Sequence, residues 1–134
     1  IHFSFDETVN ICNQILNQNI LNELNNDLIN YYCTPGEIIK LIQFAEEKKI
    51  NLRDHDVSSI INLIIENTYY KKNIFIKNLL INFIELFLLK RYKTSNNKNF
   101  LLNFYQSFIQ KINNTEKFNL DEESLFLEFK SKIL

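Results

Sequence analysis

The strongest constraint on the fold of this 134-residue chain is its near-complete lack of glycine and proline. The sequence contains one residue of each kind, and the two are adjacent, as Pro35-Gly36. Tight β-hairpins rely on glycine at positive φ, so a chain this poor in glycine has little material for a β-sheet protein. The sequence therefore predicts a fold built from helices.

Apolar residues recur at steps of three and four along most of the chain, which is the spacing of one face of an α-helix. The pattern covers residues 9–20, 21–31, 38–45 and 57–65. Only the first five residues, IHFSF, alternate in a way that indicates the end of a strand. We expect an all-α helical bundle of six to seven helices.

The sequence predicts a long helix from about Tyr70 to Arg91, with polar loops at residues 93–99 and 113–119. The polar residues of this helix form one narrow stripe, made of Lys71, Asn78, Asn82 and Glu85. The rest of its circumference is apolar, and such a helix is normally buried on several sides. We therefore expect it at the centre of a bundle.

Short polar side chains mark the expected helix starts, because their oxygens accept hydrogen bonds from the free N–H groups of the first turn. Asp6 is expected to cap the first helix, and either Asp54 or Asp56 the helix that follows residue 56. Asn119, with Glu122 three residues later, is expected to begin the last helix.

The Pro35-Gly36 pair allows two interpretations: a phosphate-binding loop or a helix start. Thr34 is a favourable N-cap, Pro35 suits the first helical position, and Glu37 completes a capping-box pattern. A phosphate site would favour more glycines and a nearby cation, whereas Glu37 would repel a phosphate at the helix mouth. The sequence therefore favours a helix start.

Composition and charge give no sign of a general attraction to nucleic acid or membrane. The formal net charge is -1, with 46% hydrophobic and 23% charged residues. The most apolar stretch, residues 74–89, contains Lys77 and Glu85 and is a poor candidate for a membrane span. With no secretory signal, we expect a cytoplasmic protein. Because Met is absent, we also expect a fragment or a trimmed start.

No residue pattern indicates an enzyme, a cofactor site or a metal site. Cys12 and Cys33 fit no zinc spacing and are expected to be small buried residues. His55 lies in RDHD (53–56), where adjacent positions point in different directions, so the stretch is interpreted as an acidic helix start. His2 has no expected partner, and no Ser, His and Asp set is marked.

Two surfaces are candidates for binding a partner. Cations that surround Tyr92 form a possible nucleic-acid patch of Lys90, Arg91, Lys93 and Lys98. The same cations also suit the C-terminus of a helix followed by a solvated loop, which the slightly negative net charge favours. Possible protein-interface residues are Tyr69, Tyr70, Arg91, Tyr92, Phe100 and Phe104. Aromatic residues dominate both interfaces and cores, so either fate remains open for them.

Three stretches resemble bacterial clamp-loader subunits. LINYYCTPGEIIKLIQFA is similar to the lid of an AAA+ module, whose turn commonly reads Gly-Ser-Pro-Gly. Here Cys33 and Thr34 replace its first two residues, and Gly36 stands about where the ATP-hydrolysing subunits carry a sensing arginine. IHFSF resembles the entry to the lid, and FNLDEESLFLEFKSKIL resembles the closing helix of the collar domain. The resemblance is to the delta-prime class, which does not hydrolyse ATP.

The resemblance implies a lid at residues 1–49, a helical collar at 54–134 and a nucleotide-binding domain upstream of Ile1. It further implies a non-catalytic role in assembling the DNA polymerase III clamp loader, the ring that places the sliding clamp on DNA. The partners would be other clamp-loader subunits, with DNA contacted indirectly through the complex. Two alternatives are a stand-alone helical nucleic-acid-binding domain and a small helical protein-interaction module.

Overall fold

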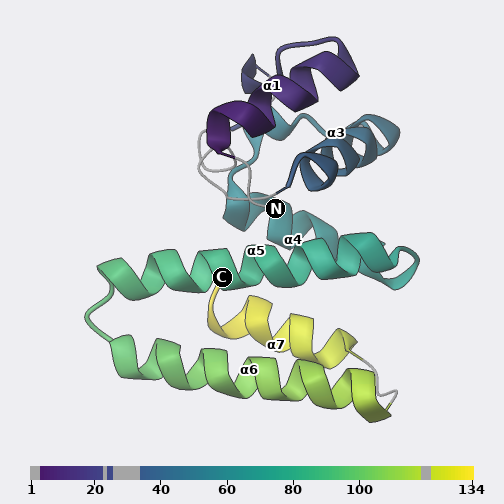
Figure 1. The fold of residues 1–134 in the computed structure, drawn as a ribbon. Coiled ribbons are helices and arrows are strands. Elements are labelled where there is room, and N and C mark those ends of the chain that lie inside the picture. The colour runs from purple at the N-terminus through teal and green to yellow at the C-terminus, as the bar shows by residue number, and fades with distance from the viewer. Residues whose placement is uncertain (1–3, 23, 26–33, 119–121) are drawn as a thin grey trace. The chain divides into compact units, whose positions relative to one another are not determined.

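The computed structural model describes residues 4–22, 24–25, 34–118 and 122–134, and within these ranges it is helical and contains no strand (Figure 1). The described α-helices are α1 (Phe5–Leu16), α3 (Pro35–Lys48), α4 (Val57–Glu66), α5 (Ile74–Thr94), α6 (Lys98–Phe118) and α7 (Glu123–Lys132). The described 3₁₀ helices are η1 (Ile20–Asn22), η2 (Leu52–Asp54) and η3 (Tyr69–Lys71). The all-α prediction is confirmed.

The chain divides into two compact units, Ile1–Ile60 and Ile61–Leu134. The division lies within α4, whereas the resemblance placed it between residues 49 and 54. The polar stretch at 51–56 does end one helix and begin another, but helix α4 runs across the boundary between the two units. The assignment of the two units to a lid and a collar stays a prediction.

In the first unit, α1 packs against α3, and short polar side chains define where the helices begin. Ser4 is the N-cap of α1 and forms a full capping box with Glu7, so the prediction of Asp6 as the cap was wrong. Asp6 lies inside the first turn, where its negative charge still suits the helix dipole. Asp56 rather than Asp54 caps α4, because its carboxylate accepts from the Ser59 N–H at 2.8 Å.

Several sequence predictions for this unit concern residues outside the described ranges. The strand end expected at IHFSF is wrong at Phe5, which begins α1, and the first three residues lie outside the described ranges. The helix expected over residues 21–31 also falls mostly outside them, as do His2 and Cys33. Cys12 is fully buried on α1, as predicted for a small apolar residue.

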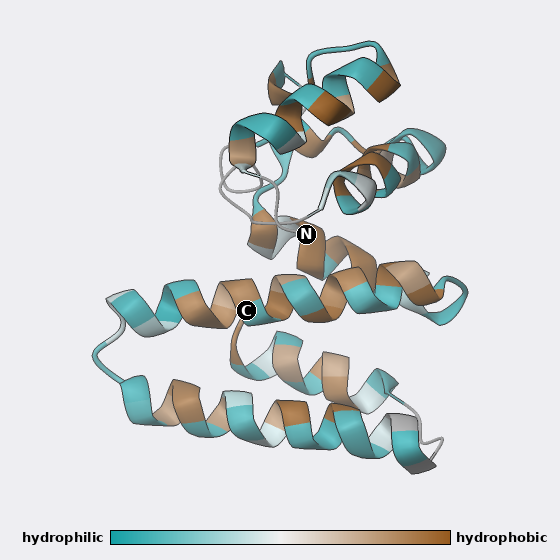
Figure 2. Cartoon of the chain, viewed as in Figure 1, coloured by the Kyte–Doolittle hydropathy of each residue, from teal (hydrophilic) through white to brown (hydrophobic). Residues whose placement is uncertain are grey.

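The second unit is built around an antiparallel pair of long helices, α5 and α6, with α7 packed beside them (Figure 1). Figure 2 shows apolar residues over much of α5, and this helix contacts both η3 and α6. Its buried side chains are Ile76, Leu79, Leu80, Phe83, Ile84 and Leu88. Aromatic side chains from α6 and α7 complete the core, with Phe126 and Phe129 fully buried.

Helix boundaries in this unit differ from the predicted ones. Helix α5 begins after its N-cap Asn73 and runs on to Thr94, so the loop expected at 93–99 shrinks to residues 95–97. The loop expected at 113–119 was wrong, because α6 stays helical through Phe118. Burial explains this helix extension: Thr115 is 6% exposed, and its hydroxyl donates to the Ile112 carbonyl at 2.7 Å.

Within the described ranges, three residues other than glycine have left-handed backbone conformations: Asn17 (φ 54°), Lys49 (φ 57°) and Thr68 (φ 54°). Asn17 and Lys49 are the C-caps of α1 and α3, a place where glycine is the usual residue. The chain's one glycine, Gly36, has no positive φ and lies in the first turn of α3.

Candidate interaction surface

The turn that contains Pro35-Gly36 is a helix start. The Thr34 hydroxyl accepts from the Glu37 N–H at 3.3 Å, and Pro35 occupies the first turn of α3. A Cβ added at Gly36 would meet only the Thr34 Oγ1, at 4.0 Å, so neither space nor φ requires glycine there. The Cys12 thiol donates to the Pro35 carbonyl at 3.6 Å, which ties α1 to this turn. Burial raises the pKa of that thiol.

The polar residues around RDHD bond to separate local partners. Asn51 donates to the Asp54 carboxylate at 2.9 Å. The Asp56 carboxylate accepts from the Ser59 N–H as the N-cap of α4. The His55 Nδ1 lies 2.6 Å from the Ser59 hydroxyl, an arrangement similar to a nucleophile and its base without the third, orienting group. Both carboxylates in this stretch are directed elsewhere, so no triad forms from it. Among the described residues, no three His, Cys, Asp or Glu side chains gather as a metal site.

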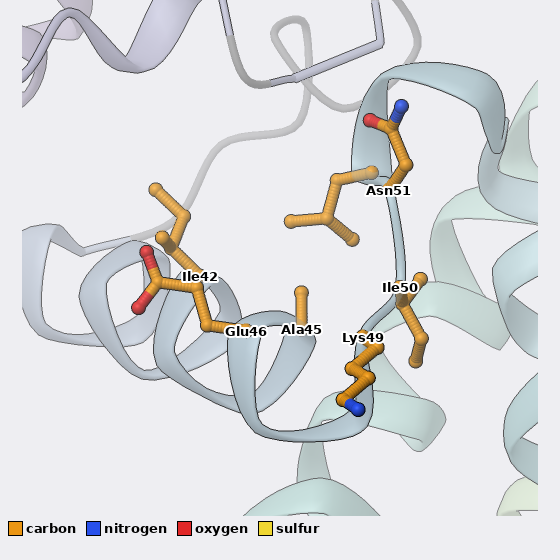
Figure 3. Close-up of a pocket in the computed structure, with 7 residues that line it drawn as sticks. Ile42, Ala45, Glu46, Lys49, Ile50 and Asn51 are labelled. Carbon is orange, nitrogen blue, oxygen red and sulfur yellow. The ribbon is translucent and has the colours of Figure 1, made fainter.

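The first unit also contains a pocket of about 350 Å³ at the C-terminal end of α3 (Figure 3). Its lining residues are Ile42, Ala45, Glu46, Lys49, Ile50, Asn51 and Leu52. Figure 3 shows that they come from α3 and from the segment that follows it. The lining combines buried aliphatic groups with one acid and one base of opposite charge. Such a site could accept an apolar side chain, and the lining contains no nucleophile paired with a base.

The α5–α6 pair presents a more distinctive surface along one side of the two helices. The Lys98 ammonium lies 5.4 Å from the centre of the Tyr92 ring. Burial, and then the charge of Glu85, raise the pKa of Tyr105. The contact of Lys98 with Tyr92 places these two residues level with each other. In an antiparallel pair, residue 85, seven positions before Tyr92, then lies level with residue 105, seven positions after Lys98.

We call this surface the hairpin seam and define it by six residues: Glu85, Leu89 and Tyr92 on α5, and Lys98, Leu102 and Tyr105 on α6. Steps of four and three residues put the α5 members on one stripe. That stripe continues the polar one that contains Asn78 and Asn82, so the outer face of α5 changes from polar to apolar toward its C-terminus. The side chains of Leu89, Tyr92 and Leu102 are 53%, 37% and 43% exposed.

The four cations proposed for a nucleic-acid patch do not share one face. Lys90, Arg91 and Lys93 are on α5, where each successive residue is rotated by about 100°. The Arg91 guanidinium lies 5.2 Å from the Phe87 ring centre, and Lys98 lies over Tyr92. Two of the four cations thus contact aromatic rings of their own chain. Nucleic-acid binding by these residues stays a prediction.

The proposed interface residues divide between core and surface. Tyr70 is 3% exposed and packs edge-on against Phe126 at 4.7 Å between ring centres, so it belongs to the core. Phe104 is half-buried against Phe108 and Phe129. Tyr69 is also half-buried, whereas Phe100 is 46% exposed and Arg91 and Tyr92 lie at the surface.

Sequence reasoning missed Leu89 and Leu102. Leu89 could have been found by extending the polar stripe from Asn78 and Glu85 by four residues, because that extension places a leucine on the solvent face. Leu102 had no comparable signal, since it lies in an apolar run (FLLNF, 100–104) in which only packing decides the exposed member.

Comparison with known proteins assigns no family to these features. Among the described helices, none combines the length and apolar character needed to cross a lipid bilayer. No protein-family model, no curated protein and no solved structure matches the chain.

Proposed function

We propose that this chain is a non-catalytic assembly module, the lid and collar region of a delta-prime-like clamp-loader subunit. In that role its helical surfaces hold neighbouring subunits in the ring that loads the sliding clamp during DNA replication. The observation that carries the proposal is the exposed apolar part of the hairpin seam. Apolar side chains gathered at the surface favour contact with another protein.

Two further features support the proposal. The chain has two helical units, the number that a lid followed by a collar requires. The Thr34 cap and Pro35 give the turn at the start of α3 the helix-starting role that the Gly-Ser-Pro-Gly turn is expected to have in the clamp-loader lid. The formal net charge of -1 also favours a protein partner over a nucleic acid.

The test is to mix the chain with clamp-loader ATPase subunits from the same source and to follow complex formation by pull-down and size-exclusion chromatography. We expect a stoichiometric complex. The double variant Leu89→Ala and Tyr92→Ala should weaken it by about tenfold or more, because truncation of a buried interface anchor costs upward of 1 kcal/mol.

Leu127→Ala is the matched control, because Leu127 on α7 is 49% exposed, close to the value for Leu89. It should leave the affinity unchanged. Circular dichroism should show that all variants retain their helix content. A folded chain that gives no complex at tens of micromolar would refute the proposal, and an equal loss in the control would refute the location of the interface.

A further inference from the structure

The hairpin seam has opposite charges at its two ends. Lys98 marks one end, level with Tyr92, and Glu85 marks the other, seven residues back along α5. The exposed leucines Leu89 and Leu102 lie between these ends. From residue 86 to residue 115 the sequence contains no acidic residue, so Glu85 is the negative end of a surface that is otherwise neutral or basic.

This order of side chains is complementary to itself. In a two-fold symmetric contact, residue i of one copy meets residue j of the other, and j meets i. If a second seam is rotated by 180° about an axis at the level of the leucines, its basic end faces Glu85 and its acidic end faces Lys98. The leucines of the two copies then face one another across the axis. Both charge pairs and the apolar contact arise from a single arrangement.

We propose that the hairpin seam binds a second copy of this chain in this two-fold arrangement. The inference rests on the proposed function in that it names a partner for the same surface. Glu85 of each copy pairs with Lys98 of the other, and the Leu89 and Leu102 side chains of both copies form the apolar centre.

The size of the seam sets the expected strength of the dimer. Glu85 and Tyr92 are seven residues apart on α5, about 10 Å along the helix axis. A contact confined to this length of two helices from each copy is smaller than a standard stable interface, so the association should be weak. We therefore expect a dissociation constant in the micromolar range and a monomer–dimer equilibrium that shifts with concentration.

Charge reversal distinguishes loss of the dimer contact from loss of monomer stability, because a second reversal can restore only the contact. Sedimentation equilibrium of the 134-residue chain between about 10 and 500 μM should show a dimer. Glu85→Lys alone should weaken it by tenfold or more, and so should Lys98→Glu, because each change places two like-charged pairs in the interface. An equimolar mixture of the two variants should restore association, since both pairs are then opposite in charge.

Glu47→Lys and Lys72→Glu are the matched controls, because both residues are exposed and lie outside the seam. They should dimerise as the wild type does. A wild-type chain that stays monomeric at 500 μM overturns the inference, as does a mixture of the charge variants that fails to associate. A monomeric chain that still binds clamp-loader subunits would overturn this inference alone, whereas a seam dimer without that complex would overturn the proposed function alone.

Discussion

The polar contacts in the two units of this protein differ in how far they reach along the sequence. In the first unit, many polar contacts lie close in sequence, such as the Ser4–Glu7 capping box and the Thr34 cap. In the second, ion pairs join distant segments: Lys77 with Glu122 at 2.8 Å and Lys130 with Glu66 at 2.7 Å. The same unit contains an aromatic core in which Phe108 contacts both Phe126 and Phe129.

The difference shows where each unit is vulnerable. A cap satisfies backbone groups within one helix turn, so its loss should be a small local cost. The aromatic core contains rings from three helices, so the loss of one ring should lower the free energy of unfolding of the whole unit. The predictions below measure this difference.

The largest expected effect is from Phe126→Ala, which removes a fully buried ring from the second unit. We expect the free energy of unfolding to fall by about 3–5 kcal/mol, because the surroundings collapse only partly into the cavity. Urea unfolding followed by circular dichroism measures it. Phe100→Ala is the control, since Phe100 is 46% exposed and its truncation should cost far less. Equal losses in the two variants would contradict the aromatic core as the main support of this unit.

A smaller effect is expected from Thr34→Ala in the first unit. The hydroxyl that accepts from the Glu37 N–H is lost, which should lower the free energy of unfolding by about 1 kcal/mol. Ser107→Ala is the control, because Ser107 is exposed on α6 and alanine favours a helix there. If Thr34→Ala lowered the free energy of unfolding as much as Phe126→Ala does, the expected difference between a local cap and a core ring would be refuted.

Acidification should weaken the second unit by a smaller amount. Hydrogen bonding and charge from Lys130 lower the pKa of Glu66, and hydrogen bonding from Lys132 is the main cause that lowers the pKa of Glu128. Folded pKa values below the unfolded ones mean that the stabilisation is complete above the unfolded pKa of about 4.3 and is lost as the pH falls through the folded values.

The free energy of unfolding, measured from pH 7 to pH 3, should therefore decline at the acid end. The double variant Glu66→Gln and Glu128→Gln should decline less steeply than the wild type. The effect should be modest because these pairs are at the surface, where water screens the charges. Glu47→Gln, at an exposed position of the first unit, should follow the wild-type curve, and identical curves for all three proteins would refute the prediction.

The smallest expected effect concerns nucleic acid. Neutralising Lys90, Arg91 and Lys93 should leave single-stranded DNA affinity at background, because Arg91 is rotated by about 160° from Lys93 on α5 and lies over the Phe87 ring. Fluorescence anisotropy with a labelled oligonucleotide at two salt concentrations measures it. A micromolar, salt-dependent affinity that the substitutions abolish would instead assign a nucleic-acid surface to the second unit.

The features predicted correctly from the sequence are those that depend on neighbouring residues. The fold class followed from apolar spacing and the near absence of glycine, and the Thr34 cap followed from the chemistry of helix caps. The same chemistry left Asp54 and Asp56 as alternatives for α4, and the structure shows Asp56. The Asp6 error came from a choice between two polar residues only two positions apart, of which Ser4 also had a partner at Glu7.

The features that the sequence could not predict depend on tertiary burial. The polar run around Thr115 has the composition of a loop, yet packing of the adjacent Ile112 keeps it helical. Tyr70 and Tyr92 have the same side chain, but Phe126 covers Tyr70 whereas Tyr92 stays 37% exposed. The hairpin seam requires the register between α5 and α6, which no single helix pattern contains.

The left-handed residues described above mark places where this protein holds its backbone against the preference of the side chain. A residue with a Cβ costs about 1 kcal/mol or more in the left-handed region relative to glycine. Asparagine tolerates this region better than most residues, so Asn17 should be the least strained of the three and the β-branched Thr68 the most strained. The scarcity of glycine that favours a helical fold thus carries a cost in conformational stability where the helices end.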